Sequence, residues 1–262
     1  MNEESAGTQP VRPADFSRLN RAHILPFAVF IGLSMALQLL IGPLIEWKHP
    51  SAPWWRQAPE QWLYPIQAIV VFGLLVRHWR HYEFRWSAKG VITGIFCGVI
   101  GIGIWLLPTT LYDRLGLTTE PEGWMKWLGI AGRKEGFDPG IFHSPAAWWT
   151  AVILRFFRAV VVVALMEEIF WRGFLMRFLL KPDGDYWNQP FGKASWLSYG
   201  VVTVAFVFIH QPLDWPAALF YGTITYALCL RSKSLGACVA MHATANLLMS
   251  LYVMAYGKYG LW

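Results

Sequence analysis

Two adjacent carboxylates lie inside an apolar stretch, and they are the residues from which the chemistry of this chain can be argued. The stretch covers residues 164–178 and reads ALMEEIFWRGFLMRF. A charge inside a membrane-spanning helix costs about 2.5–3.5 kcal/mol on insertion scales, so it is expected to have a partner and a function. Residues four apart share a helix face, whereas neighbours diverge by about 100°. We therefore predict that Glu168 pairs with Arg172 as a support and that Glu167 is free for catalysis.

Two later apolar segments supply further groups of the kind that hydrolysis needs. FVFIH places Phe206 and His210 four residues apart, and HATAN does the same for His242 and Asn246. Counted from Arg177, Ser195 and Leu235 as the cytoplasmic ends of the three runs, Glu167, His210 and His242 come to lie in the inner half or the middle of the bilayer. We predict that these two histidines and the asparagine share one site with Glu167, and that Phe206 packs.

Two mechanisms can use this set. In the first, Glu167 and His210 activate a water that attacks a peptide carbonyl, while His242 and Asn246 stabilise the oxyanion. In the second, Glu167, His210 and His242 are ligands of a zinc ion whose bound water attacks. Each residue alone also has a structural interpretation, because ion pairs and interface asparagines fasten transmembrane helices together. The combination of all four is what favours a catalytic site.

The composition indicates that membrane-spanning helices position these residues. The chain has 262 residues, of which 55% are hydrophobic, 16% aromatic and only 15% charged, whereas soluble domains usually have about 25% charged residues. We predict an all-α, polytopic transmembrane bundle with an intramembrane catalytic cavity. The net charge is +6, but the basic residues gather between apolar runs. That pattern reflects membrane topology and headgroup attraction, and it argues against nucleic-acid binding.

We count seven apolar runs as candidate spans, of which the second is short. They cover residues 24–45, 62–76, 90–112, 146–180, 196–210, 216–230 and 235–256. An eighth span is expected if the run at 146–180, which exceeds the thickness of the hydrocarbon layer, divides in two. We assign residues 1–145 to N-terminal transmembrane helices and loops and residues 146–262 to the catalytic core of one integral membrane domain.

Basic residues set the expected orientation. They are concentrated in residues 12–21, 77–89, 177–193 and 231–233, which alternate with less basic loops. The positive-inside rule then places the N-terminus in the cytoplasm, and we predict a multi-pass protein of the bacterial inner (plasma) membrane. Arg155 and Arg158 lie near the other end of the fourth run, where we expect them to snorkel or to pair with Asp138 or Asp214.

The motifs, taken in order, resemble the CPBP family of intramembrane proteases, which includes the CAAX prenyl endopeptidase of the Rce type. EEIFWR fits EExxxR, FVFIH fits FxxxH and HATAN fits HxxxN, and the likeness covers residues 150–256. The resemblance implies an all-α fold with a conical, cytosol-facing cavity. It also implies that the first glutamate of the pair and His210 activate the water, that His242 and Asn246 form the oxyanion site, and that Glu168 with Arg172 supports them. It favours a metal-free mechanism without a cofactor, with zinc as the alternative.

Two longer segments, residues 166–179 and 234–262, are similar to a bacterial subgroup called CAAX prenyl protease-related proteins, which tends to occur with exosortase and PEP-CTERM sorting systems. The expected partners are therefore a membrane-anchored, lipidated or unlipidated protein or peptide substrate, the lipid bilayer and an exosortase-type system, with no nucleic acid. The predicted function is that of an intramembrane endopeptidase. The alternatives are a non-catalytic scaffold or immunity-type protein and a transporter, and the absence of repeated halves disfavours the transporter.

Overall fold

The computed structural model describes residues 10–36, 51, 53–116, 123–133 and 136–262, and within these ranges it contains helices and no strand. The predicted all-α class is therefore confirmed. The separate helices are α1 (Pro13–Ala36), α2 (Trp54–Gln57), α3 (Glu60–Arg77), α4 (Ala88–Leu115), α8 (Trp196–Phe208), α9 (Trp215–Ser232) and α10 (Leu235–Tyr256).

One continuous helical rod of 34 residues joins the helices of the fourth apolar run. It consists of α5 (Pro145–Phe156), the π-helical segment η5 (Phe157–Val163), α6 (Ala164–Glu168), a second π-helical segment η6 (Ile169–Leu175) and α7 (Met176–Phe178). The run at 146–180 is thus a single helix, and the eighth span that its division would have created is not formed. π-Helical turns are rare and are frequent at functional sites.

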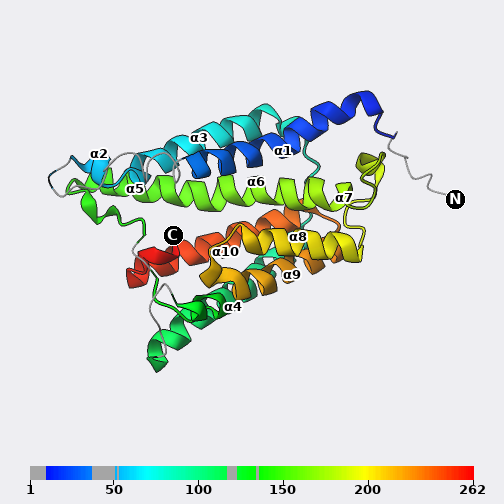
Figure 1. The fold of residues 1–262 in the computed structure, drawn as a ribbon. Helices are drawn as coiled ribbons and strands as arrows, with labels where there is room; N and C mark the ends of the chain where they lie inside the picture. Colours follow the sequence, from blue (N-terminus) through cyan, green and yellow to red (C-terminus); the bar gives the residue numbers. More distant parts are fainter. Residues whose placement is uncertain (1–9, 37–50, 52, 117–122, 134–135) are drawn as a thin grey trace.

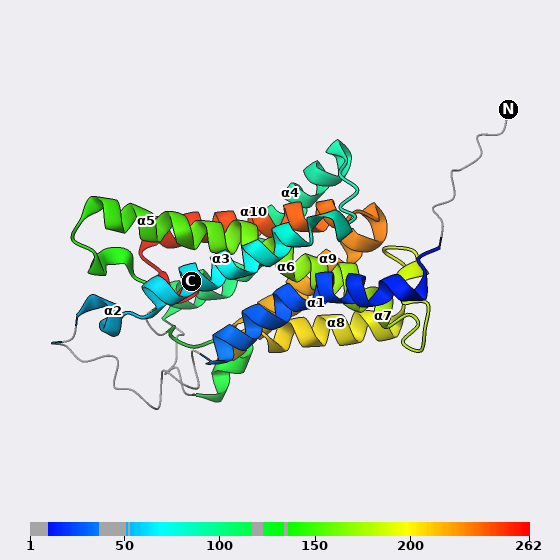
Figure 2. The ribbon, with the colours of Figure 1, turned by 90° about the horizontal axis from the view of Figure 1, so that it is seen from above.

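The helices form two layers (Figures 1 and 2). α1, α3 and the rod pack against one another in one layer, and α4, α8, α9 and α10 pack together in the other. The layers meet where α10 contacts η5 and α6. The apolar core lies between them and includes Met166, Ile169, Phe206 and Met241, all of which are almost fully buried. The carboxylates on the rod therefore face the histidine-bearing helices.

Four helices are long and apolar enough to cross a membrane: α1, α4, the rod and α10. The other three predicted spans correspond to α3, α8 and α9, which are shorter or less apolar. The first predicted run is displaced, because α1 begins at Pro13 rather than at residue 24. Proline is well suited to the first turn of a helix, and Asp15 adds a favourable charge there. Residues 37–45 of that run lie outside the described residues.

Glycines let α4 approach α10 closely. A Cβ added at Gly94 would lie 2.3 Å from the Ala237 carbonyl oxygen, and one at Gly98 would lie 2.6 Å from that of Met241. Only glycine tolerates such backbone proximity. Gly103 is different, because a Cβ there meets nothing within 4 Å. The close α4–α10 contact holds the segment of α10 that carries the second histidine.

Serines cap the helices that carry the site residues. Each Ser side chain accepts a hydrogen bond from the backbone N–H three residues on, which satisfies one of the free donors of the first turn. The pairs are Ser87 with Gly90 in α4, Ser195 with Ser198 in α8 and Ser234 with Ala237 in α10. The register of each helix is thereby fixed at its start.

Candidate active site

Glu168 is completely buried and connects two of the predicted site residues. Its Oε1 atom accepts a hydrogen bond from Arg172 Nη1 at 3.1 Å and another from His242 Nδ1 at 2.9 Å. The predicted pair with Arg172 is therefore present, and Glu168 also orients an imidazole on α10. Because a carboxylate only accepts, Nδ1 of His242 carries the proton, and the other ring nitrogen, Nε2, is not used by this contact.

Phe206 contacts His210 through its backbone carbonyl and through its ring. Its carbonyl oxygen accepts a hydrogen bond from His210 Nδ1 at 2.7 Å, and the two rings lie 4.6 Å apart. The Arg172 guanidinium lies over the Phe206 ring at 5.6 Å. A carbonyl also only accepts, so Nε2 of His210 is left unprotonated in the neutral ring. Phe206 packs, as predicted, and it also fixes the tautomer of His210.

Asn246 reaches from α10 to the rod. Its Nδ2 atom donates a hydrogen bond to the carbonyl oxygen of Ala159 at 2.7 Å. Ala159 lies in η5. The change from α-helical to π-helical winding there alters which backbone carbonyls accept hydrogen bonds from within the helix. An asparagine amide has two N–H donors. One is therefore used to hold the two helices together, and the other is available to a ligand.

His210, His242 and Asn246 line one cavity of about 270 Å³ between the two layers. Its other lining residues come from α4, the rod, α9, the α8–α9 loop and the C-terminal turn. They include Trp105, Arg155, Arg158, Asp214, Tyr221 and Trp262. Three of the four residues predicted to carry the chemistry are thus brought together by two segments, the turn after α8 and helix α10.

Glu167 lies beside this group but is not among the lining residues. It is 7% exposed, and its Oε2 atom is buried without a hydrogen-bond partner in the described part of the chain. Arg158, which does line the cavity, interacts electrostatically with it. Val163, one turn earlier on the rod, also lines the cavity. Glu167 is therefore not paired with Arg172, in line with the helix-face argument, and it lies one turn beyond the cavity wall.

The alternative zinc site does not fit this arrangement. Among the described residues, no three His, Cys, Asp or Glu side chains are grouped closely enough to hold a metal ion. The predicted ligands Glu167, His210 and His242 are consequently not clustered, since the cavity brings only the two histidines together. Structural and catalytic zinc sites need three or four ligands at about 2 Å. We derive no step through a metal.

Sequence reasoning missed two aromatic residues of the site. Tyr221 lies edge-on to His242 with the ring centroids 5.9 Å apart, and its buried hydroxyl has no hydrogen-bond partner among the described residues. Trp105 lies edge-on to His210 at 5.2 Å. Both are single aromatic residues in apolar helices rich in such residues, so no spacing distinguished them. Only the packing of α4 and α9 against the histidines identifies them.

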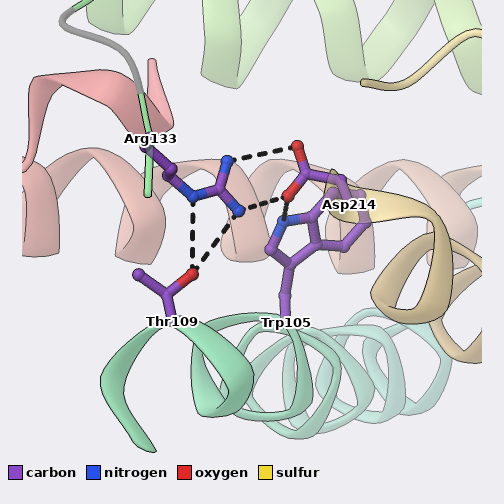
Figure 3. Close-up of polar contacts among 4 residues, drawn as sticks. All are labelled: Trp105, Thr109, Arg133 and Asp214. Atoms are coloured by element: carbon purple, nitrogen blue, oxygen red, sulfur yellow. Dashed lines mark hydrogen bonds and ion pairs between the residues drawn. The ribbon is translucent and has the colours of Figure 1, made fainter. Parts of the chain in front are cut away.

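Asp214 is held by a cluster at the end of the cavity (Figure 3). Arg133 forms an ion pair with it, Trp105 Nε1 donates a hydrogen bond to its Oδ1 atom at 3.1 Å, and the Arg133 guanidinium also reaches Thr109 Oγ1. The expected pairing of Asp214 with Arg155 or Arg158 is therefore wrong, because Arg133 from the α4–α5 loop occupies the carboxylate. Snorkelling is also wrong for Arg155, which is only 7% exposed.

The cavity lies toward one end of the bundle. Asp214 and Trp262, which line it, belong to the α8–α9 loop and to the C-terminal turn, at the end opposite the α7–α8 connection (Figure 1). Leu261 lines both this cavity and a neighbouring groove of about 540 Å³. The positive-inside rule assigns the α7–α8 end to the cytoplasm. A cytoplasmic N-terminus and a cytosol-facing cavity, both expected from the sequence, are therefore not compatible in this fold.

Comparison with known proteins identifies the part of the chain that contains the site. Residues 148–248 match the model of a family described as "Type II CAAX prenyl endopeptidase Rce1-like". The match is less than half of the chain, but it includes the rod from α5 onward and all six predicted site residues. No curated protein and no solved structure matches the chain.

Proposed function

From the match of residues 148–248 to the Rce1-like, CAAX-type protease family, we propose that the chain is a CPBP-type intramembrane endopeptidase. The proposed reaction is hydrolysis of a peptide bond in a membrane-tethered protein. The observation that carries the proposal is the cavity in which His210, His242 and Asn246 meet beside Glu167, whose Oε2 atom has no hydrogen-bond partner among the described residues. A lipid on the substrate and a link to exosortase-type systems remain predictions from the sequence.

Water activation is assigned to Glu167 and His210. The Nδ1 proton of His210 is held by the Phe206 carbonyl, so its Nε2 atom can accept a hydrogen bond from a water in the cavity. A rotation of the Glu167 side chain toward the cavity would bring its unpartnered Oε2 atom to the same water as a second acceptor. Two acceptors on one water would orient a lone pair toward the substrate carbonyl and take up the proton as the bond to carbon forms.

Stabilisation of the oxyanion is assigned to His242 and Asn246. Asn246 has one amide N–H left beyond its bond to Ala159. His242 can donate from Nε2 when that atom carries a proton, and the Glu168 carboxylate at Nδ1 then compensates the charge of the ring. The fully buried Arg172 in turn balances Glu168. Preorganised donors of this kind typically contribute a factor of about 10²–10³ each.

The test is a proteoliposome cleavage assay with a panel of membrane-tethered peptides, followed by mass spectrometry of the products. We expect Glu167→Gln, His210→Ala and His242→Ala to lower kcat by a factor of about 10² or more each. The control is His143→Ala, which removes an exposed imidazole outside the cavity and is expected to cleave at the wild-type rate.

Two outcomes contradict the proposal. Cleavage that persists in all three site variants removes the catalytic assignment. Tight binding of the peptides without cleavage by wild type on any panel member favours the scaffold or immunity-type alternative. Treatment with a chelator separates the mechanisms, because full activity in metal-free protein rules out a catalytic zinc ion, and loss that zinc restores favours the alternative ligand set of Glu167, His210 and His242.

The orientation in the membrane follows from combining charge and fold. We propose that the N-terminus is cytoplasmic in a bacterial inner membrane, so that the cavity lies toward the outer face. The basic segments at 177–193 and 231–233, at the end away from the cavity, support this orientation. Labelling of intact cells with a membrane-impermeant maleimide tests it. A cysteine in place of Lys258 is expected to react, and one in place of Lys181 is expected to react only after lysis. The reverse pattern would restore a cytosol-facing cavity.

A further inference from the structure

Three buried arginines of the rod differ in how their charge is balanced. Arg172 lies 3.1 Å from the carboxylate of Glu168, and Arg177 lies 3.9 Å from that of Glu83. Arg155, with 7% of its surface exposed, has no carboxylate within ion-pair distance among the described residues. Buried cations in proteins are normally paired, because removing an ion from water costs several kcal/mol. Arg155 is thus the exception among them, and it is the one that lines the cavity.

Aromatic rings form the immediate surroundings of Arg155. Its guanidinium lies over the rings of Tyr64, Phe137 and Trp262 at 5.6, 5.3 and 5.7 Å. These rings attract the charge through their π-faces, but they do not accept the hydrogen bonds that its N–H groups can donate. The Nε and Nη1 atoms are accordingly buried without a hydrogen-bond partner in the described chain. The cation is held in place and remains able to receive an anion.

A purely structural role for Arg155 is the competing interpretation. Unused N–H groups alone do not decide against it, since Arg172 also has unpartnered nitrogen atoms. The difference lies in charge and position: Arg172 is balanced by Glu168 and points into the core, whereas Arg155 lacks a counter-ion and faces the cavity that holds His210 and His242. A residue needed only to pack three rings would not have to be a cation on a cavity wall.

Arg158 lies beside Arg155 on the same wall and is already engaged. Its Nε and Nη2 atoms both donate to Gln67 Oε1 at 3.2 Å, and it interacts electrostatically with Glu167. The other acidic lining residue, Asp214, is paired with Arg133. Among the described residues that line the cavity, Asp214 has an ionic partner and Arg158 is hydrogen bonded to Gln67, whereas Arg155 has neither a carboxylate partner nor an acceptor for its Nε and Nη1 atoms.

We propose that Arg155 binds a carboxylate of the peptide substrate, so that the cavity recognises an anionic peptide. This inference rests on the proposed protease function. Arg155 precedes Ala159, whose carbonyl holds Asn246, by four residues, which is about 6 Å along a helix. An extended peptide advances about 3.3–3.6 Å per residue. About two residues of extended peptide span the distance between these two positions on the rod. The Arg155 side chain extends the distance between the bound carboxylate and the bond under attack further. The bound carboxylate is either the C-terminal carboxylate or an acidic side chain.

Binding of short peptides tests this without relying on catalysis. The probes are acetyl-leucyl-leucyl-alanine as the free acid, the same peptide as its amide, and acetyl-leucyl-glutamyl-alanine amide, titrated calorimetrically into the full chain in detergent. We expect wild type to bind at least one carboxylate-bearing probe roughly tenfold or more tightly than the neutral amide, since a charge-assisted hydrogen bond is worth about 1.5–3 kcal/mol. Tighter binding of the free acid identifies the C-terminal carboxylate as the ligand of Arg155, and tighter binding of the glutamyl peptide amide identifies an acidic side chain.

Variants assign the effect to Arg155. In Arg155→Gln the preference for acid over amide is expected to disappear, and in Arg155→Lys it is expected to be reduced, because lysine keeps the charge but not the planar fork. The control Arg114→Gln removes an exposed cation at the same end of the bundle and is expected to keep the preference. Equal binding of all three probes by wild type, or an unchanged preference in Arg155→Gln, overturns the proposal. Cleavage can still occur in that case, so the proposed protease function is tested separately.

Discussion

Buried charge is balanced in different ways toward the two ends of the rod. At one end, Glu168 lies between Arg172 and His242, so that a carboxylate, a guanidinium and an imidazole balance one another without solvent. At the other end, Arg155 is surrounded by aromatic rings and has no carboxylate within reach among the described residues. The rod places both on one helix, with two π-helical segments between its α-helical parts.

The difference separates charges that hold the protein together from charges that act on a ligand. The Glu168 cluster connects the rod to α10 and, through the ring of Phe206, to α8. Losing one member leaves another charge buried and uncompensated. Arg155 has no ionic partner to leave behind, and its charge is therefore available to a molecule that enters the cavity. Stability and binding should depend on different arginines of the same helix.

The largest expected effect is on stability, and it comes from removing matched arginines at the two ends. Arg172→Met is expected to lower the free energy of unfolding by about 3–5 kcal/mol, because Glu168 is left without its counter-ion in the core. Arg155→Met is expected to change it by about 1 kcal/mol or less, since the lost contacts with the rings are offset by the removal of an unpaired buried cation. Thermal and denaturant unfolding in one detergent would measure both.

A double variant makes this comparison sharper. Arg172→Met combined with Glu168→Gln is expected to recover part of the lost stability, because no charge is then left unpaired. If Arg155→Met destabilises as much as Arg172→Met, the two ends do not differ in the way described, and Arg155 is a structural residue.

A smaller effect is expected on activity when the bridging carboxylate is neutralised. Glu168→Gln retains an oxygen that can accept from His242 but removes the negative charge, and comparable changes behind a site residue cost about 10–100-fold. We expect kcat to fall by that factor with the affinity for the acid probe unchanged, measured by the cleavage assay and by calorimetry. A parallel loss of peptide binding would instead show that Glu168 shapes the whole cavity.

The sequence predicted the positions of the site residues better than it predicted their surroundings. The Glu168–Arg172 pair, the free state of Glu167 and the meeting of His210 with His242 follow from i, i+4 spacing and from the cost of charge in apolar helices. The link between Glu168 and His242 joins residues 74 positions apart, and nothing in local periodicity specifies it.

The errors in the prediction have identifiable physical causes. We predict from the sequence that Asp214 pairs with Arg155 or Arg158, but in the structure Asp214 forms its ion pair with Arg133 from the loop after α4. Loop geometry of this kind depends on tertiary packing and not on pattern. Helix α1 begins before the apolar run that predicts it, because Pro13 and Asp15 favour an earlier start. The position of the cavity relative to the basic end of the bundle could not be predicted from the sequence, because it depends on how three helices and a loop pack together.

The π-helical segment η5 (Phe157–Val163) has a consequence for the register of the rod. It lies between Arg155 and Glu168, so it sets the angle at which these two residues face the layer of α10. Removing one residue there, with the winding of the rest of the segment unchanged, would turn one end of the rod against the other by about 100°. The arginine would then leave the cavity wall while the carboxylate kept its partners. A single-residue deletion in this segment would therefore uncouple substrate recognition from the hydrolytic groups without changing any of their side chains.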